Sequence, residues 1–386
     1  MTNDQCRFEP FTVDGSDELE EHLERTCEMV LAGVLKVVSP MRLEALLLGG
    51  GYGRGEGGVL KTETGDRPYN DLEFYVCPRG PHWLNERRYG TTLHELAAAL
   101  SGIAGVDVEF KILPLRKLRR SPVSMFYYDL VVRNRRLWGT EHILDRCSHH
   151  RDAKQIPLSE ATRLLMNRCS GLLFAKERLE HEPFTLEDAD FVGRNLAKAQ
   201  LALGDVLLTV YGQYHWSCRE RAERLKRINC EFPHLTEVQC HHGAGVRFKL
   251  HPEKTASSRS MLQQRHQNLS TLARELWLWL ESRRLRYSFE NIRSYTRNPS
   301  RKCPETSRWR NCLVNLKTYG WRLLFSRQLT RYPRERVLEA LPLLLWLPQT
   351  CFDEQLLRFV QSALDSPART FPELFRAYQS LWARFN

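Results

Sequence analysis

The chain has 386 residues, of which 42% are hydrophobic, and this length and composition are typical of two or three globular domains with buried cores. Its most apolar run, LPLLLWLP from Leu341, is far shorter than the ~20 residues of a membrane-spanning helix, so we expect a cytoplasmic protein with no membrane partner. The formal net charge of +11 favours anionic partners such as phosphates, nucleotides or nucleic acid.

The first 155 residues predict a mixed α/β domain. Ser16 can cap an amphipathic helix over 17–38, and LEALLL at 43–48 predicts a buried strand that ends at a glycine-rich segment. Ser121-Pro122 predicts the cap and first turn of a short helix ending near Asp129. The remaining expected elements are strands at 71–78, 106–114 and 135–139 and a helix over 83–100.

From residue 156 onward strand signals are nearly absent, and helical periodicity predominates. Ser159 is the expected cap of the first helix, and the predicted helices cover 159–179, 186–214, 260–286, 309–327, 334–346, 353–364 and 372–384. The segment from Arg283 to Arg310 has few apolar residues and predicts an exposed basic loop or linker. We therefore expect an α+β chain, with a small mixed-sheet domain over 1–155 and an all-helical domain over 156–386.

The segment Gly49–Gly58 has seven glycines in ten positions, which permits close approach of the backbone to a ligand. A G-x-G-x-x-G pattern begins at Gly53, but Gly65 and Pro68 leave no room for the crossover helix of a dinucleotide-binding fold. No GK[ST] sequence follows, which excludes a Walker A loop. The chain also lacks the full set of protein-kinase motifs, so a protein kinase is not expected.

Acidic residues alternate on two of the predicted strands. Asp71 and Glu73 share one face of their strand, and Asp107 and Glu109 repeat the pattern on another. Four carboxylates on one small sheet repel each other unless a cation lies between them, and oxygen-only ligand sets suit Mg²⁺. The alternative is a solvated sheet face whose acids pair with arginines.

Three short motifs occur in a characteristic order: Leu48-Gly49-Gly50, then Asp71-Leu72-Glu73-Phe74, then Val108-Glu109-Phe110. This arrangement resembles the nucleotidyltransferase superfamily of the DNA polymerase β type. YYDLVVRNRRLWG, which ends at Gly139, is similar to the end of such domains. The helical half resembles the domains that follow this core in bacterial aminoglycoside-type nucleotidyltransferases.

The resemblance implies transfer of a nucleoside monophosphate from ATP or another nucleoside triphosphate to an unidentified small-molecule or protein acceptor. It implies two Mg²⁺ ions held by Asp71, Glu73 and Glu109, with Asp107 as the other candidate for the third acid. The nucleotide would contact the glycine segment and nearby cations, namely Gly49, Gly50, Gly51, Gly53, Arg54 and Lys61.

Two further questions remain open at this level. The chain has Gly-Gly where the family usually has Gly-Ser, so a catalytically degenerate nucleotide- or nucleic-acid-binding protein on the same scaffold is the alternative function. On the acceptor side, Asn195, Lys198 and Asp205 recur at near-helical spacing, although an acid such as Asp205 in an apolar run is also explained by a structural ion pair. Contact of the basic segment with nucleic acid is the less favoured interpretation of its arginines.

Overall fold

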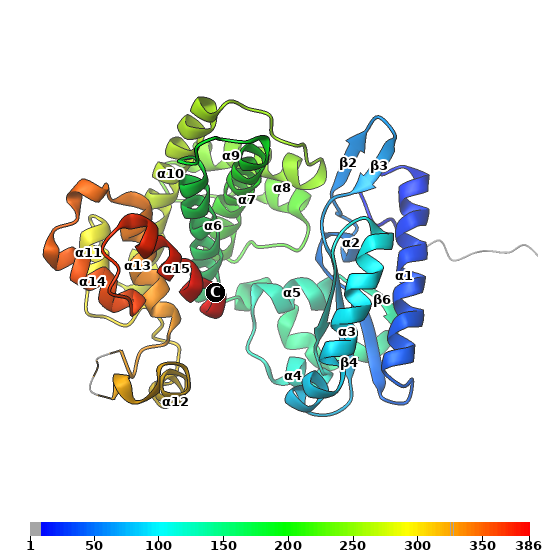
Figure 1. The fold of residues 1–386 in the computed structure, drawn as a ribbon. Helices are drawn as coiled ribbons and strands as arrows, with labels where there is room; N and C mark the ends of the chain where they lie inside the picture. The colour runs from blue at the N-terminus through cyan, green and yellow to red at the C-terminus, as the bar shows by residue number, and fades with distance from the viewer. Residues whose placement is uncertain (1–8, 325, 327) are drawn as a thin grey trace, which may run out of the picture. The chain divides into compact units, whose positions relative to one another are not determined.

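The computed structural model describes residues 9–324, 326 and 328–386 (Figure 1). The chain forms two compact units. The α/β unit contains the chain up to Pro157 together with residues 207–229 and 242–253, and the helical unit contains residues 158–206, 230–241 and 254–386. The first break lies close to the expected boundary at 155/156, but two later segments belong to the first unit, so the division is not a single cut in the sequence.

The α/β unit begins with the predicted amphipathic helix. Ser16 caps helix α1 (Asp17–Val37) by accepting a hydrogen bond from the Leu19 amide, as the sequence predicted. The elements that follow are β1 (Leu43–Leu48), α2 (Gly50–Gly53), β2 (Val59–Thr62), β3 (Gly65–Pro68), β4 (Leu72–Pro78), α3 (His82–Ala104), β5 (Val108–Ile112), α4 (Leu115–Arg120), α5 (Met125–Val132), β6 (Arg135–Trp138), η1 (Glu141–His150), η2 (Ala153–Gln155) and, from the later segments, α8 (Cys218–Arg227).

The main sheet has the strand order β5-β4-β1-β6, and β2 and β3 form a separate hairpin. Strand β1 runs antiparallel to β4 and β6, whereas β4 and β5 are parallel and are connected through α3. Leu72, Phe74 and Val76 of β4 pack in a core with α1 and α3. The other face, with Tyr75 and Cys77, packs on residues of α4, α5 and η1. The mixed α+β class is therefore confirmed.

One local prediction in this unit is wrong. Ser121 does not begin a helix but is the C-cap of α4, and Ser124 is the residue that caps α5 through its side chain and the Tyr127 amide. The Ser-Pro pair misled because Pro122 is also compatible with the extended link between two short helices.

The helical elements of the second half are α6 (Leu158–Arg178), α7 (Leu186–Val210), α9 (Leu235–Leu250), α10 (Arg259–Leu285), α11 (Ile292–Arg297), α12 (Arg308–Tyr319), η3 (Gly320–Leu323), α13 (Arg334–Trp346), η4 (Gln349–Cys351), α14 (Glu354–Leu364) and α15 (Phe371–Phe385). Most predicted helices are confirmed, but α6 begins at Leu158, so Ser159 lies in its first turn and is not the cap. The helix expected over 309–327 ends at Tyr319, and its predicted residues 325 and 327 lie outside the described residues. Helices α8, α9 and α11 were not predicted.

The basic segment between Arg283 and Arg310 is folded, and the prediction of an exposed loop is wrong. Tyr295 and Lys302 are fully buried. The Lys302 ammonium donates to the carbonyl oxygens of Tyr295 at 2.7 Å and Asn298 at 3.3 Å, and burial lowers its pKa to about 8. Some of the polar groups that made this segment look like a loop are therefore satisfied inside the helical unit.

The arginines of this segment bind their own unit. Arg293 donates to the Cys351 carbonyl at 2.9 Å, and Arg301 donates to the Thr306 carbonyl at 2.7 Å. These contacts weaken the case for nucleic-acid binding by this segment.

In the described part of the chain, no helix is both long enough and apolar enough to cross a membrane.

We expect Lys302→Ala to lower the free energy of unfolding by about 3 kcal/mol, because it leaves two buried carbonyls without a donor and removes the cation beside buried acids. Urea denaturation followed by tryptophan fluorescence measures this loss. Lys317→Ala, at an exposed position on α12, is the matched control and should change stability by less than about 0.5 kcal/mol. Equal effects of the two substitutions would contradict a buried structural role for Lys302.

Candidate metal centre

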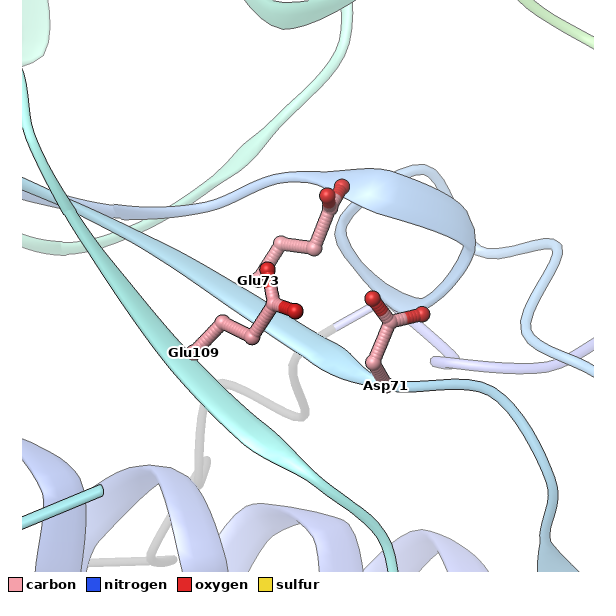
Figure 2. Close-up of side chains that lie close together, drawn as sticks. All are labelled: Asp71, Glu73 and Glu109. Carbon is pink, nitrogen blue, oxygen red and sulfur yellow. The ribbon is translucent and has the colours of Figure 1, made fainter. Parts of the chain in front are cut away.

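Three acids from two neighbouring strands converge in the α/β unit. Asp71 directly precedes β4, Glu73 lies on β4, and Glu109 lies on β5 opposite Glu73. Each offers a carboxylate oxygen, and these atoms all lie within 4.8 Å of one another. Figure 2 shows the three carboxyl groups pointing into a common space. Strand alternation and the parallel register therefore bring together the three acids that the sequence singled out.

Asp107, the other candidate for the third acid, lies outside this group. The pairing of β4 with β5 begins at Leu72 and Val108, so Asp107 precedes the strand. Its carbonyl accepts from the Leu72 amide at 2.8 Å, and its side chain is exposed.

Lys111 supplies a cation to this cluster, and sequence analysis missed it. Its ammonium lies 2.6 Å from Glu73 Oε1 and 3.1 Å from Glu109 Oε2. Partial burial lowers the pKa of Lys111, but its bond to Glu73 and its proximity to Glu109 outweigh burial and raise the pKa overall. The signal in the sequence was the spacing of two residues from Glu109, which places Lys111 on the same face of β5.

Asp71 is left with excess negative charge. Among the described residues it forms no ion pair, and its pKa is raised by burial and by repulsion from Glu73 and Glu109, with Lys111 only partly opposing this. The three carboxylates form a set of oxygen ligands with excess negative charge, and Lys111 already places a cation beside them. Such a ligand set fits a hard divalent ion such as Mg²⁺.

The glycine turn is attached directly to this cluster. The Gly49 amide donates to the Glu73 carbonyl at 2.9 Å. Gly50 has a φ of +62°, a backbone conformation that favours glycine, and a Cβ atom there would lie 3.0 Å from Glu73 Oε2. The amides of Gly50 and Gly51 begin α2 and have no acceptor within the described residues, as is usual for a first helical turn.

Gly53 is required by the packing of the turn. Its amide donates to the Gly49 carbonyl at 2.9 Å, and a Cβ atom would lie 2.1 Å from the Leu48 carbonyl oxygen. Gly57 is similarly confined, because a Cβ atom there would lie 2.0 Å from the Tyr52 ring. Part of the glycine content therefore serves the tight packing of the turn.

The two cations predicted to contact nucleotide are both engaged in ion pairs. Arg54 is largely buried, with 12% of its side chain exposed, and lies 3.2 Å from Asp129 of α5. Lys61 is exposed on the β2–β3 hairpin and pairs with Asp66 at 2.8 Å. Arg54 also acts electrostatically on Tyr75 of β4, whose pKa is raised by burial and by Glu73 and is lowered by Arg54.

The residues predicted to lie on the acceptor side belong to the helical unit and are divided between two environments. Asn195 and Lys198 line one cavity. Asp205 is buried, with 5% of its surface exposed, and acts on Arg168, whose pKa is lowered by burial and raised by this acid. A buried acid beside an arginine is the arrangement of a structural ion pair, which favours the structural interpretation of Asp205.

Comparison with protein-family models, with curated proteins and with solved structures gave no match. Inference about function therefore depends on the chemistry of the residues themselves.

We expect Asp71→Asn to raise the free energy of unfolding of the metal-free protein at pH 7 by about 0.5–1 kcal/mol, because one of three repelling charges at a partly exposed site is removed. The pKa of Asp71 is raised, so its destabilising charge is fully present above that pKa and disappears as pH falls toward the ordinary aspartate value. The difference between the two proteins should therefore shrink in acid.

Addition of Mn²⁺ should stabilise the wild-type protein and leave Asp71→Asn nearly unchanged, which urea denaturation with and without the ion measures. Asp107→Asn is the matched control and should behave as wild type in both conditions. A response of Asp71→Asn to Mn²⁺ equal to that of wild type would contradict a metal centre at this cluster.

Proposed function

We propose that the protein is a Mg²⁺-dependent nucleotidyltransferase that transfers a nucleoside monophosphate, with ATP as the expected donor, to an acceptor hydroxyl. The observation that carries the proposal is the convergence of Asp71, Glu73 and Glu109 within 4.8 Å beside a glycine turn. The mixed sheet, with its acids on two adjacent strands and the turn following β1, agrees with the resemblance to the DNA polymerase β type superfamily.

In the proposed reaction, some residues would hold the metal ion and others would contact the phosphate groups. Asp71, Glu73 and Glu109 would hold Mg²⁺, which when bound supplies charge neutralisation for the triphosphate and activation of the acceptor hydroxyl. The amides of Gly50 and Gly51, which begin α2 beside the acids, would donate to phosphate oxygens. Arg54, oriented by Asp129, would supply a further positive charge in place of the hydroxyl that the family usually has.

In the reaction itself, the acceptor oxygen forms a bond to the α-phosphorus and the bond from that phosphorus to pyrophosphate breaks. The hydroxyl proton leaves to solvent. Because the protein forms no covalent bond in this scheme, its contribution is positioning and electrostatic stabilisation.

One observation favours a second candidate function. The Lys111 ammonium already neutralises part of the cluster at 2.6 Å from Glu73. If this ion pair is permanent, the acids are a structural ion-pair group, and the protein is a metal-independent nucleotide-binding protein on the same scaffold. The response of the cluster to metal separates the two functions.

Asp71→Asn combined with Glu73→Gln should lower Mg²⁺-dependent release of pyrophosphate at least ~100-fold, because several kcal/mol of charge stabilisation is lost with the cation. Since the acceptor is unidentified, binding of the non-cleavable donor α,β-methylene ATP, measured by calorimetry in Mg²⁺ and in EDTA, is the companion readout. Asp107→Asn is the control for both. Binding that is equally strong in EDTA would favour the second function, and no binding in either condition would refute both.

Lys111→Met should tighten Mn²⁺ binding about fivefold, because the ion no longer displaces an ammonium worth roughly 1 kcal/mol. Titration of Mn²⁺ by electron paramagnetic resonance measures the change, with Lys117→Met, an exposed lysine of α4, as the control. Under the second function the same substitution would destabilise the protein and produce no metal site.

A further inference from the structure

Strand β5 forms one edge of the main sheet and has a partner strand on one side only. In the order β5-β4-β1-β6 it pairs with β4, and within the described residues no strand lies on its other side. Its burial alternates, because Val108 and Ile112 are buried whereas Glu109 and Lys111 are exposed. An unpaired edge presents a row of backbone donors and acceptors with which another strand can pair.

The pairing with β4 determines which backbone groups of β5 point outward. The Leu113 amide donates to the Val76 carbonyl of β4 at 2.8 Å. Because successive residues of a strand direct their backbone groups to opposite sides, the N–H and C=O groups of Val108, Phe110 and Ile112 point away from β4. These three residues therefore form the free edge.

Most of the hydrogen-bonding capacity of this edge is unused. The Val108 amide donates to Ser101 Oγ, at the end of α3, at 2.9 Å, which agrees with its outward direction. In the part of the chain that the structure describes, the outward amides of Phe110 and Ile112 have no acceptor. Two donors of the edge are thus available to a further strand.

A cavity of about 530 Å³ lies beside the same edge, between α3 and β5. On the α3 side its lining includes Gly90, Ala97 and Ala98, whose small side chains leave space. Phe110 also lines it and is only half-buried. The outward residues of β5 have their side chains on this face of the sheet, so apolar side chains of an added strand would enter the cavity.

The sequence of β5, VEFKI, is complementary to itself when two copies run antiparallel. If Phe110 lies opposite Phe110 of a second copy, then Val108 lies opposite Ile112, and Glu109 lies opposite Lys111. The outward backbone groups of the two copies then meet in the positions of an antiparallel ladder. The opposite charges also meet directly across the strands, once on each side of the two-fold axis, which stabilises the pairing.

The charges also select this register over its neighbour. A shift of the two-fold axis to Val108 would keep the outward residues opposite one another, but it would set Glu109 opposite Asp107 of the second copy. Like charges directly opposite each other destabilise a pair of strands.

We propose that the protein forms a two-fold symmetric dimer through antiparallel pairing of β5 with β5 of a second copy, which joins the two four-stranded sheets into one. The paired segment of five residues is short, so the dimer is weak and depends on concentration. The contact uses no metal or nucleotide, and the proposal does not depend on the proposed transferase activity.

The first test is sedimentation equilibrium in EDTA, which measures the Kd of the dimer. Glu109→Lys and Lys111→Glu each set like charges opposite one another on both sides of the axis, so each should weaken the Kd at least ~10-fold. Lys117→Glu reverses the charge of an exposed lysine on α4 and is the matched control, whose Kd should equal that of wild type.

Mixing the two single variants provides the decisive readout. At positions 109 and 111 one chain then has two cations and the other has two anions, so every opposite pair across the strands is attractive again. The equimolar mixture should form a dimer about as tightly as wild type, although each variant alone does not. A folding defect in either variant would not produce this mutual rescue.

The second test uses the wild-type chain and needs no substitution. Amide hydrogen exchange of β5 should be slower at about 500 µM than at about 5 µM protein, because pairing protects the outward amides. Strand β6, at the opposite edge of the sheet, is the internal control and should exchange equally at both concentrations.

The proposal is overturned if wild type remains monomeric and β5 exchanges equally at both concentrations, or if protection appears only in other elements. It is also overturned if the single variants associate as wild type does, or if their mixture stays monomeric while circular dichroism shows both to be folded. If either variant does not fold, exchange at β5 in the wild-type chain decides the question.

Discussion

The parallel pairing of β4 with β5 is the constraint on which the candidate centre depends. Its register sets Glu73 directly opposite Glu109, and like charges opposite each other on one sheet face destabilise a pair of strands. Positive charge in the space between the acids reduces this repulsion. Lys111 provides that charge from within the chain, and a divalent ion is the external alternative, so the local stability of the sheet and the occupancy of the site are coupled.

The same strand also determines where a ligand can approach. Gly49 bonds to the backbone of Glu73, and the left-handed backbone at Gly50 keeps the turn close to that carboxylate. The turn is therefore held beside the acids. Gly53 and Gly57 allow the turn to pack tightly against Leu48 and Tyr52, so the chain uses glycine here for two physical reasons.

Sequence patterns could predict those features that depend on local periodicity. Strand alternation predicted that Asp71 and Glu73 share one face and left Glu109 and Asp107 as candidates for the third acid, and the cap at Ser16 was visible in the chain. The position of Asp107 could not be predicted, because it depends on where strand pairing begins. The burial of Lys302 could not be predicted either, because a segment rich in charged residues has the same composition whether its charges are buried in ion pairs or exposed in a loop.

The distribution of charge explains why the net charge of +11 was a poor guide to a partner. Much of the basic surplus binds the protein's own carbonyls and acids, as Arg293 and Arg301 do. At the cluster of Asp71, Glu73 and Glu109 the local charge is negative, so under the proposed function an anionic nucleotide would be attracted there only through a cation.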